Sequence, residues 1–210
     1  MTTLLEGLRE PDALRRWRRR FDARHIAEAA LAAAAGDSVE DVASAGLAAA
    51  DAAHRAMLDD GSRIHAEIAA DLEAGRRCQA MTVVEMLGLV SWRCEVPGVR
   101  EGWYGGTIDL LAVDASATVH VVDWKTTVGG FPAEARPREA LQVAAYSGML
   151  VAGDGGGLVP AAAGLVQCHV ARLSADAVAV STIDVAAAWT EWVELAGRPE
   201  PELVERVRRI

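Results

Sequence analysis

Two apolar segments that carry charged residues constrain the fold of this chain more than any other feature. The first covers residues 106–111 and contains Asp109, and the second covers residues 121–127 and contains Asp123 and Lys125. Both read as neighbouring β-strands. A carboxylate or an ammonium group in such a segment is costly to remove from water. It therefore needs an opposite charge, a metal ion or a catalytic role to account for it.

The connection between the two segments predicts how they pair. Residues 114–118 are the only turn-like stretch between them, so a hairpin centred on Ser116 pairs residues whose numbers sum to 232. This register sets Asp109 opposite Asp123, with Cβ atoms roughly 4.5–5.5 Å apart. Lys125 lies on the same face because side chains alternate along a strand. Two carboxylates this close repel unless a cation lies between them, which predicts a site for Mg²⁺ or Mn²⁺ and a bound water.

The charged hairpin has an ordinary alternative, a solvated cross-strand salt bridge. An isolated Asp-x-Lys triplet forms such a bridge far more often than it forms a functional centre. Here both strands are strongly apolar on either side of the charges. That context favours the functional centre.

Length and composition predict one compact, cytoplasmic domain. The chain has 210 residues, 51% of them apolar, which suffices for a real core. No apolar run approaches the ~20 residues of a membrane helix, and the N-terminus lacks the order of a signal peptide. The net charge of −9 argues against coating nucleic acid by charge alone. The three cysteines indicate neither a disulfide framework nor a metal knuckle; they are Cys78, Cys94 and Cys168.

The order of elements predicts an α/β (α+β) fold with a mixed central sheet flanked by helices. We expect a helical region over residues 1–75 and the sheet-containing core over residues 76–210, together forming one compact domain. The predicted helices cover about 11–36, 38–58, 62–74, 83–87 and 133–150, with one or two more at the C-terminus. Asp59, Asp60 and Gly61 are expected to end the second of these helices and separate it from the third. The predicted strands cover about 91–96, 104–113, 118–126, 164–173 and 178–183.

The first predicted helix is rich in arginine. Residues 9–24 hold seven arginines against three acidic residues, and Trp17 and Phe21 are interleaved with them. Such a segment can grip phosphates or stack on bases, which makes Arg16, Trp17 and Arg20 candidate nucleic-acid contacts. It equally fits an amphipathic helix with its aromatic residues against a core and its arginines in solvent. The two interpretations are compatible.

The charged hairpin belongs to a longer set of motifs. Gly106 to Asp109 and Asp123 to Thr126 are followed by Gln142 and Tyr146, one helical turn apart and able to face one groove. This set resembles the PD-(D/E)XK nuclease superfamily, and more narrowly its RecB-like exonuclease branch. That branch also has a histidine in a Gly-Thr-x-x-His context, which His65 matches with a serine for the threonine. Many members carry a glutamate on the first strand, where this chain has Glu95.

The resemblance implies a restriction-endonuclease-like core and a divalent-metal-dependent DNA exonuclease acting on linear or single-stranded ends in recombination, repair or replication. By this resemblance His65, Asp109, Asp123 and the Trp124 carbonyl hold one or two Mg²⁺ or Mn²⁺ ions, Lys125 positions the attacking water, and Gln142, Tyr146 and Glu95 support the DNA groove. Relatives with an iron–sulfur cluster bracket the core with four cysteines. Three cysteines therefore imply no such cluster here.

Two other functions stay open beside the exonuclease. One is a structure-specific or nicking endonuclease of the same fold. The other is a catalytically retired domain that binds DNA or serves as a scaffold, although the intact Asp–Asp–Lys set argues against it. The sequence leaves open the cleavage polarity, a recombination or helicase partner, and an oligomeric assembly.

Overall fold

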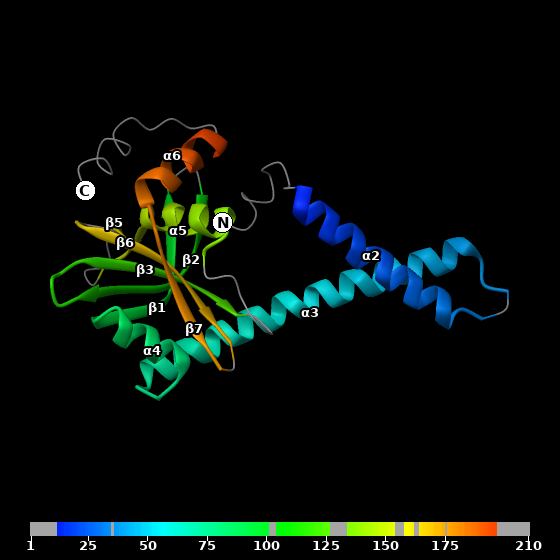
Figure 1. Ribbon diagram of the computed structural model, residues 1–210, viewed down its shortest axis with the longest axis horizontal. Helices are drawn as coiled ribbons and strands as arrows, with labels where there is room; N and C mark the ends of the chain where they lie inside the picture. The colour runs from blue at the N-terminus through cyan, green and yellow to red at the C-terminus, as the bar shows by residue number, and fades with distance from the viewer. Residues whose placement is uncertain are drawn as a thin grey trace. The chain divides into compact units, whose positions relative to one another are not determined.

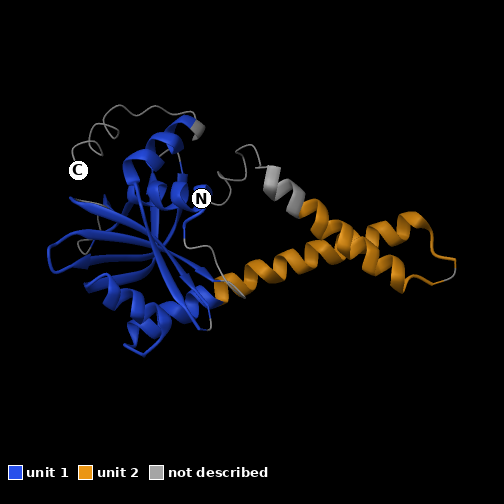
Figure 2. Ribbon diagram, in the orientation of Figure 1, with its two compact units in different colours: residues 1–5, 64–210 blue, residues 6–63 orange. Residues whose placement is uncertain are grey.

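The computed structural model (Figure 1) describes residues 12–34, 36–100, 104–126, 134–153, 158–161, 164–174 and 176–196, with the side chains of residues 12–17 and 195–196 excepted. These residues fall into two compact units, one within residues 64–210 and one within residues 6–63 (Figure 2). The boundary between the units lies between Arg63 and Ile64. Within the described ranges, no helix has the length and apolar character needed to cross a membrane.

The smaller unit is helical. It contains α2 (Asp12–Ala32) and the first part of α3 (Val39–Glu73). Ser38 begins α3 by accepting a hydrogen bond from the Asp41 amide at 3.1 Å. The two helices approach closely at Gly46, where an added Cβ atom would lie 2.5 Å from the Cα atom of Ile26. A larger residue at this position would push the helices apart.

The structure corrects the predicted break at residues 59–61. Helix α3 runs without interruption for 35 residues. A glycine inside a helix costs only about 1 kcal/mol relative to alanine, so the alanine-rich stretches at residues 43–56 and 66–74 carry the helix through Gly61. The two predicted helices are therefore one. The last turns of α3, from Ile64 onward, belong to the larger unit and carry His65.

The larger unit is built on a seven-stranded sheet with the order β5-β4-β1-β2-β3-β6-β7. The strands are β1 (Leu89–Arg100), β2 (Tyr104–Asp114), β3 (Val119–Thr126), β4 (Leu150–Ala152), β5 (Leu158–Pro160), β6 (Val166–Leu173) and β7 (Val178–Ile183). Only β3 and β6 pair in parallel, and the other neighbours are antiparallel. The predicted mixed sheet is confirmed.

Helices cover both faces of the sheet (Figure 1). On one face lie α5 (Pro137–Ser147) and α6 (Val185–Ala196), and α5 is the helix in the connection between the parallel strands β3 and β6, which also contains β4 and β5. On the other face lie α4 (Gln79–Met86) and the last turns of α3. The core between these helices and the sheet includes Ile68, Leu72, Val83, Leu110, Val122 and Trp124.

Several predicted boundaries move for identifiable reasons. β1 continues through Pro97 and Gly98, where the sequence predicts a stop. Proline has no amide donor, but β4 pairs with β1 only at Gly98 and Val99. On the β4 side of the strand, Pro97 therefore needs no hydrogen-bonded partner. The sequence prediction lacks the strands β4 and β5, which have three residues each. α5 begins at Pro137 instead of near residue 133, since proline suits the first turn of a helix.

Candidate active site

The β2–β3 hairpin has the predicted register. Its paired residues are Leu110 with Val122, Leu111 with Val121, Ala112 with His120 and Val113 with Val119. Asp114 closes the turn by accepting hydrogen bonds from the Ser116 amide at 2.8 Å and the Thr118 amide at 2.9 Å. The ladder ends at Leu110 and Val122, so Asp109 and Asp123 come next in the register, at the position where regular pairing stops.

A third carboxylate extends this row onto β1. In the β1–β2 ladder Cys94 pairs with Leu110 and Val96 pairs with Ile108, which leaves Glu95 opposite Asp109 outside the regular pairing. The backbone of Glu95 has a φ of 49°, in the left-handed region that non-glycine residues rarely adopt. Such a conformation costs on the order of 1–3 kcal/mol and is frequent at functional sites. Three adjacent strands thus present an acidic residue at one level of the sheet.

Asp109 is fixed between a strand and a helix. Its Oδ2 atom accepts a hydrogen bond of 2.7 Å from the Trp124 backbone amide. Its Oδ1 atom lies 3.4 Å from Nδ1 of His65 on α3. The side chain is buried. These contacts hold the carboxylate in one orientation, as a metal ligand or a catalytic group requires.

His65, Glu95 and Asp109 form a cluster suited to a cation. One potential ligand atom from each of the three residues lies within 4.8 Å of the other two. Partial burial raises the pKa of Glu95, and the neighbouring Asp109 charge raises it further. Carboxylate oxygens and an imidazole nitrogen match the preferences of Mn²⁺ and, for the oxygens, Mg²⁺. The sequence assigned Glu95 to the DNA groove, whereas the structure groups it with His65 and Asp109.

Asp123 is buried beside this cluster and pairs with Lys125. Its Oδ2 atom lies 2.7 Å from Nζ of Lys125, yet this atom lacks a hydrogen bond of good geometry among the described residues. Burial raises the pKa of Asp123, Lys125 opposes that shift, and Asp109 adds to it. A buried carboxylate next to a second one is destabilised in its charged form until a cation approaches. This donor set therefore fits a divalent metal ion.

Helix α5 brings the predicted glutamine and tyrosine to Lys125. Nζ of Lys125 lies 3.4 Å from Oε1 of Gln142, and Nε2 of Gln142 donates to Oη of Tyr146 at 2.7 Å. Tyr146 is buried, and burial followed by the charge of Asp123 raises its pKa. The hydroxyl therefore stays protonated. The residues predicted from two separate motifs form one hydrogen-bonded chain.

A buried ion pair that sequence reasoning missed supports this chain. Arg172 on β6 stands next to Lys125 in the parallel register and is 2% exposed. Its guanidinium pairs with Glu139 on α5. The carboxylate of Glu139 also accepts a 2.7 Å hydrogen bond from the Arg136 amide, which completes a capping box at the start of α5. The pair fastens the first turn of α5 to the strand beside Lys125.

Of the remaining predicted residues, Trp124 contributes its backbone amide to this centre, and the others lie elsewhere or outside the described side chains. The Trp124 side chain is buried in the core on the face of α3 and α4. Arg20 is exposed on α2, in the smaller unit. The side chains of Arg16 and Trp17 fall outside the described part of the chain. Cys78 and Cys94 are partly exposed, and Cys168 is buried.

Protonation of His65 should oppose metal binding. The hydrogen bond to Asp109 raises the pKa of His65 above its usual value, and burial opposes this only in part. A metal ligand must be the neutral imidazole. We expect the affinity for Mn²⁺ to increase as the pH rises from about 6.5 through the raised pKa. Isothermal titration at a series of pH values measures this, and the slope should be shallower in the His65→Asn variant, where only the raised pKa of Asp123 contributes.

Metal-free stability should change in the opposite direction. A histidine whose pKa is raised in the folded state contributes stability below its unfolded pKa of about 6.5 and loses it as the pH rises through the folded pKa. The raised pKa of Asp123 acts with the same sign from lower pH. We expect the thermal midpoint in EDTA to fall with rising pH, less steeply in His65→Asn. The His54→Asn variant, elsewhere on α3, is the control, and equal slopes in both variants would contradict the assignment.

Comparison with known proteins agrees with this geometry. The family model described as the PD-(D/E)XK nuclease superfamily matches residues 3–207. A search of curated proteins gives no significant match. The family match covers the acidic row, the Asp123–Lys125 pair and nearly all of the mixed fold around them. The chain therefore belongs to the PD-(D/E)XK nuclease superfamily, whose members are divalent-metal-dependent nucleases.

Proposed function

We propose that the protein is a divalent-metal-dependent DNA exonuclease of the RecB-like type, which hydrolyses phosphodiester bonds at strand ends during recombination, repair or replication. The observation that carries this proposal is the ion pair between the buried Asp123 and the partly exposed Lys125, next to Asp109 and at the level where regular strand pairing stops. A purely structural ion pair would not need a second buried carboxylate beside it.

The proposed metal ligands surround Asp109. They are His65, Asp109, Asp123 and the Trp124 carbonyl, and Glu95 joins them because its carboxylate reaches His65 and Asp109. A bound Mg²⁺ or Mn²⁺ ion supplies an acidified water and offsets negative charge on the phosphate. The protein's own contribution is to hold the acidic side chains at fixed positions before the substrate arrives. The Trp124 amide holds Asp109 through a hydrogen bond, and Lys125 holds Asp123 through an ion pair.

Lys125 is the proposed group that positions the attacking water. Its side chain is 27% exposed, so the ammonium group can reach a substrate while its partner Asp123 stays buried. An ammonium group in this position also stabilises the negative charge that develops on the phosphate. Gln142 and Tyr146 restrict the directions in which Nζ can point. We assign these two residues to the wall of the DNA groove.

The exonuclease mode rests on two features. The Gln142 and Tyr146 spacing resembles the RecB-like branch. The arginine-rich helix α2 supplies exposed cations, among them Arg20, in a protein whose overall charge of −9 repels DNA. We assign Arg16, Trp17 and Arg20 to contacts with a single strand.

Degradation of matched linear and circular DNA tests the proposal. With Mg²⁺ or Mn²⁺, labelled linear DNA should release mononucleotides or short oligonucleotides from one end, and a circle of the same sequence should stay intact. Blocking each end in turn gives the polarity. Nicking of the circle would support the endonuclease instead. Absence of cleavage of any DNA by folded, metal-loaded protein would support a retired domain and overturn the proposal.

A further inference from the structure

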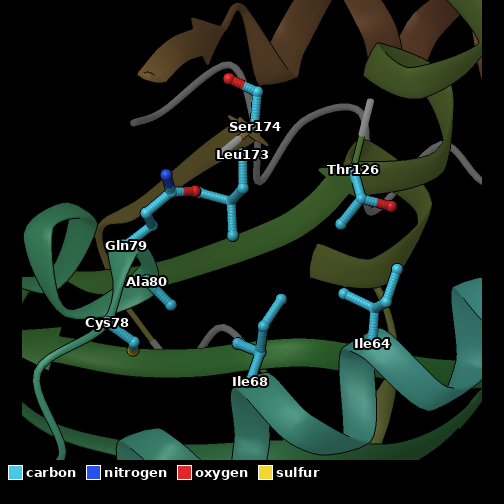
Figure 3. Close-up of a pocket in the computed structure, with 8 residues that line it drawn as sticks. All are labelled: Ile64, Ile68, Cys78, Gln79, Ala80, Thr126, Leu173 and Ser174. Carbon is cyan, nitrogen blue, oxygen red and sulfur yellow. The ribbon is translucent and has the colours of Figure 1, made fainter. Parts of the chain in front are cut away.

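We infer that a pocket beside the acidic row binds the base of a nucleotide that flanks the cleaved phosphate. This inference rests on the proposed function. The pocket has a volume of about 320 Å³ and lies wholly within the larger unit (Figure 3). Its lining comes from the last turns of α3, the start of α4 and the ends of the parallel strands β3 and β6; these residues are Ile64, Ile68, Cys78, Gln79, Ala80, Thr126, Leu173 and Ser174.

Two chain segments connect the lining of the pocket with the proposed active site. Ile64 directly precedes His65 on α3, and Thr126 directly follows Lys125 on β3. Because side chains alternate along a strand, Thr126 faces the pocket while Lys125 faces α5. Thr126 lies three residues beyond Asp123, on the order of 10 Å along the strand. That separation is comparable to the reach of one nucleotide from its phosphate to its base.

The lining predicts a neutral occupant. None of the eight described residues that line the pocket is charged. A phosphate in this position would have to lose its water against aliphatic side chains without a cation to replace it. Ile64 and Ile68 project into the pocket from α3, and Leu173 lies across from them (Figure 3). Such side chains suit the flat, weakly polar faces of a nucleobase.

The polar groups of the pocket suit the edge of a base. The Gln79 amide carries both donors and acceptors, and the Thr126 and Ser174 hydroxyls can do either. Aliphatic faces combined with mixed donors and acceptors match a nucleobase better than they match a sugar or a phosphate.

Protection of Cys78 from a thiol reagent tests binding without cleavage. The protein is the 210-residue chain with the Lys125→Met substitution, so that the probe, a short single-stranded DNA, stays intact. Cys94 is the internal reference, because it is partly exposed and does not line the pocket. We expect the DNA to slow alkylation of Cys78 severalfold without affecting Cys94. One abasic nucleotide, moved along the first positions from the end, should remove the protection at one position.

Cleavage kinetics of the wild-type protein provide the second test. An abasic nucleotide at the DNA position that the Cys78 protection experiment identifies should lower kcat/KM by about 10-fold. This effect is within the range that base contacts contribute in single-strand binding. Ser174→Phe should fill the pocket and make normal and abasic substrates equally poor. Ser91→Phe, at an exposed position on β1, is the matched control. This variant should keep the difference in kcat/KM between normal and abasic substrates. If Ser174→Phe does not fold, Gln79→Ala should reduce the same difference.

The outcomes separate this inference from the proposed function. If the wild-type protein cleaves DNA but handles every abasic substrate like normal DNA, and the DNA does not protect Cys78, the pocket does not bind a base and the nuclease assignment stands. If no DNA is cleaved under any metal condition, the proposed function fails first. Protection of Cys78 that persists with every abasic probe would show contact by the sugar–phosphate chain, and this also overturns the inference.

Discussion

Replacing Lys125 with methionine is expected to reduce kcat by about 10²- to 10³-fold, the range found when one preorganised group is removed from a charged transition state. Lys125 touches Asp123 and Gln142, so the substitution removes the cation at the centre of the site and leaves the hydrophobic core in place. KM should change little, because methionine retains most of the length of the side chain. Single-turnover cleavage of labelled linear DNA measures the chemical step directly.

Substitutions of the two members of this ion pair should affect stability differently, although both reduce activity. Lys125→Met leaves the carboxylate of Asp123, which is 1% exposed, without its counterion, so the metal-free protein should lose stability. Asp123→Asn removes the buried charge, so it should lose activity without that loss of stability. Arg93→Met, at an exposed position on β1, is the control for loss of a positive charge. Wild-type cleavage by Lys125→Met would overturn the assigned role.

Lys125 can also be observed directly, because it is the only lysine among the 210 residues. Reductive methylation with a ¹³C label therefore places reporters on this nitrogen and on the α-amino group of the chain. The ion pair with Asp123 should shift the lysine signal, and binding of Mg²⁺ near Asp123 should move it again. Asp123→Asn should abolish the metal-dependent change. A signal that metal does not move would place the binding site elsewhere.

Glu139→Gln is expected to destabilise the larger unit by about 3–5 kcal/mol, the cost of leaving a buried charge without its partner. Arg172 is 2% exposed, and its Nη1 atom already lacks a hydrogen bond among the described residues. Glutamine keeps an oxygen that can accept the hydrogen bond from the Arg136 amide, so the capping box is retained. Any loss of stability is then due to the lost charge. Urea denaturation followed by tryptophan fluorescence measures the change, since Trp189 and Trp192 are buried.

An exposed ion pair in the same unit supplies the matched control. Asp71 and Arg76 lie 2.7 Å apart, but their side chains are 35% and 58% exposed. Asp71→Asn should therefore change stability by less than about 1 kcal/mol. The double variant with Glu139→Gln and Arg172→Met should recover much of the loss, because it removes the unpaired charge. If the Glu139→Gln variant is as stable as the wild type, water must solvate the charge of Arg172 in place of Glu139.

The β2–β3 hairpin could be predicted because its determinants are local. The turn at residues 114–118 and the alternation on both sides set the register of Asp109 and Asp123 without reference to the rest of the chain. The placement of Glu95 depends on a left-handed backbone conformation that no sequence pattern signals. The grouping of Glu95 with His65 and Asp109 therefore emerged only from the structure.

Contacts between distant residues were beyond sequence reasoning for a different reason. Glu139 and Arg172 are 33 residues apart and meet only because α5 crosses over between parallel strands. An arginine in the apolar run of β6 was the one available signal. The predicted helix break at Gly61 failed because a local preference of about 1 kcal/mol is weaker than the continuity of a long helix. The three-residue strands β4 and β5 are too short to give a periodic pattern.

The acidic row has a consequence for how the protein folds. Glu95, Asp109 and Asp123 are spaced 14 residues apart on three successive antiparallel strands. Contacts between such close segments form early, because little chain entropy is lost when they meet. The three carboxylates should therefore come together before β6 docks in parallel. Repulsion among them would slow that early step, so divalent cations should accelerate refolding as well as stabilise the folded state.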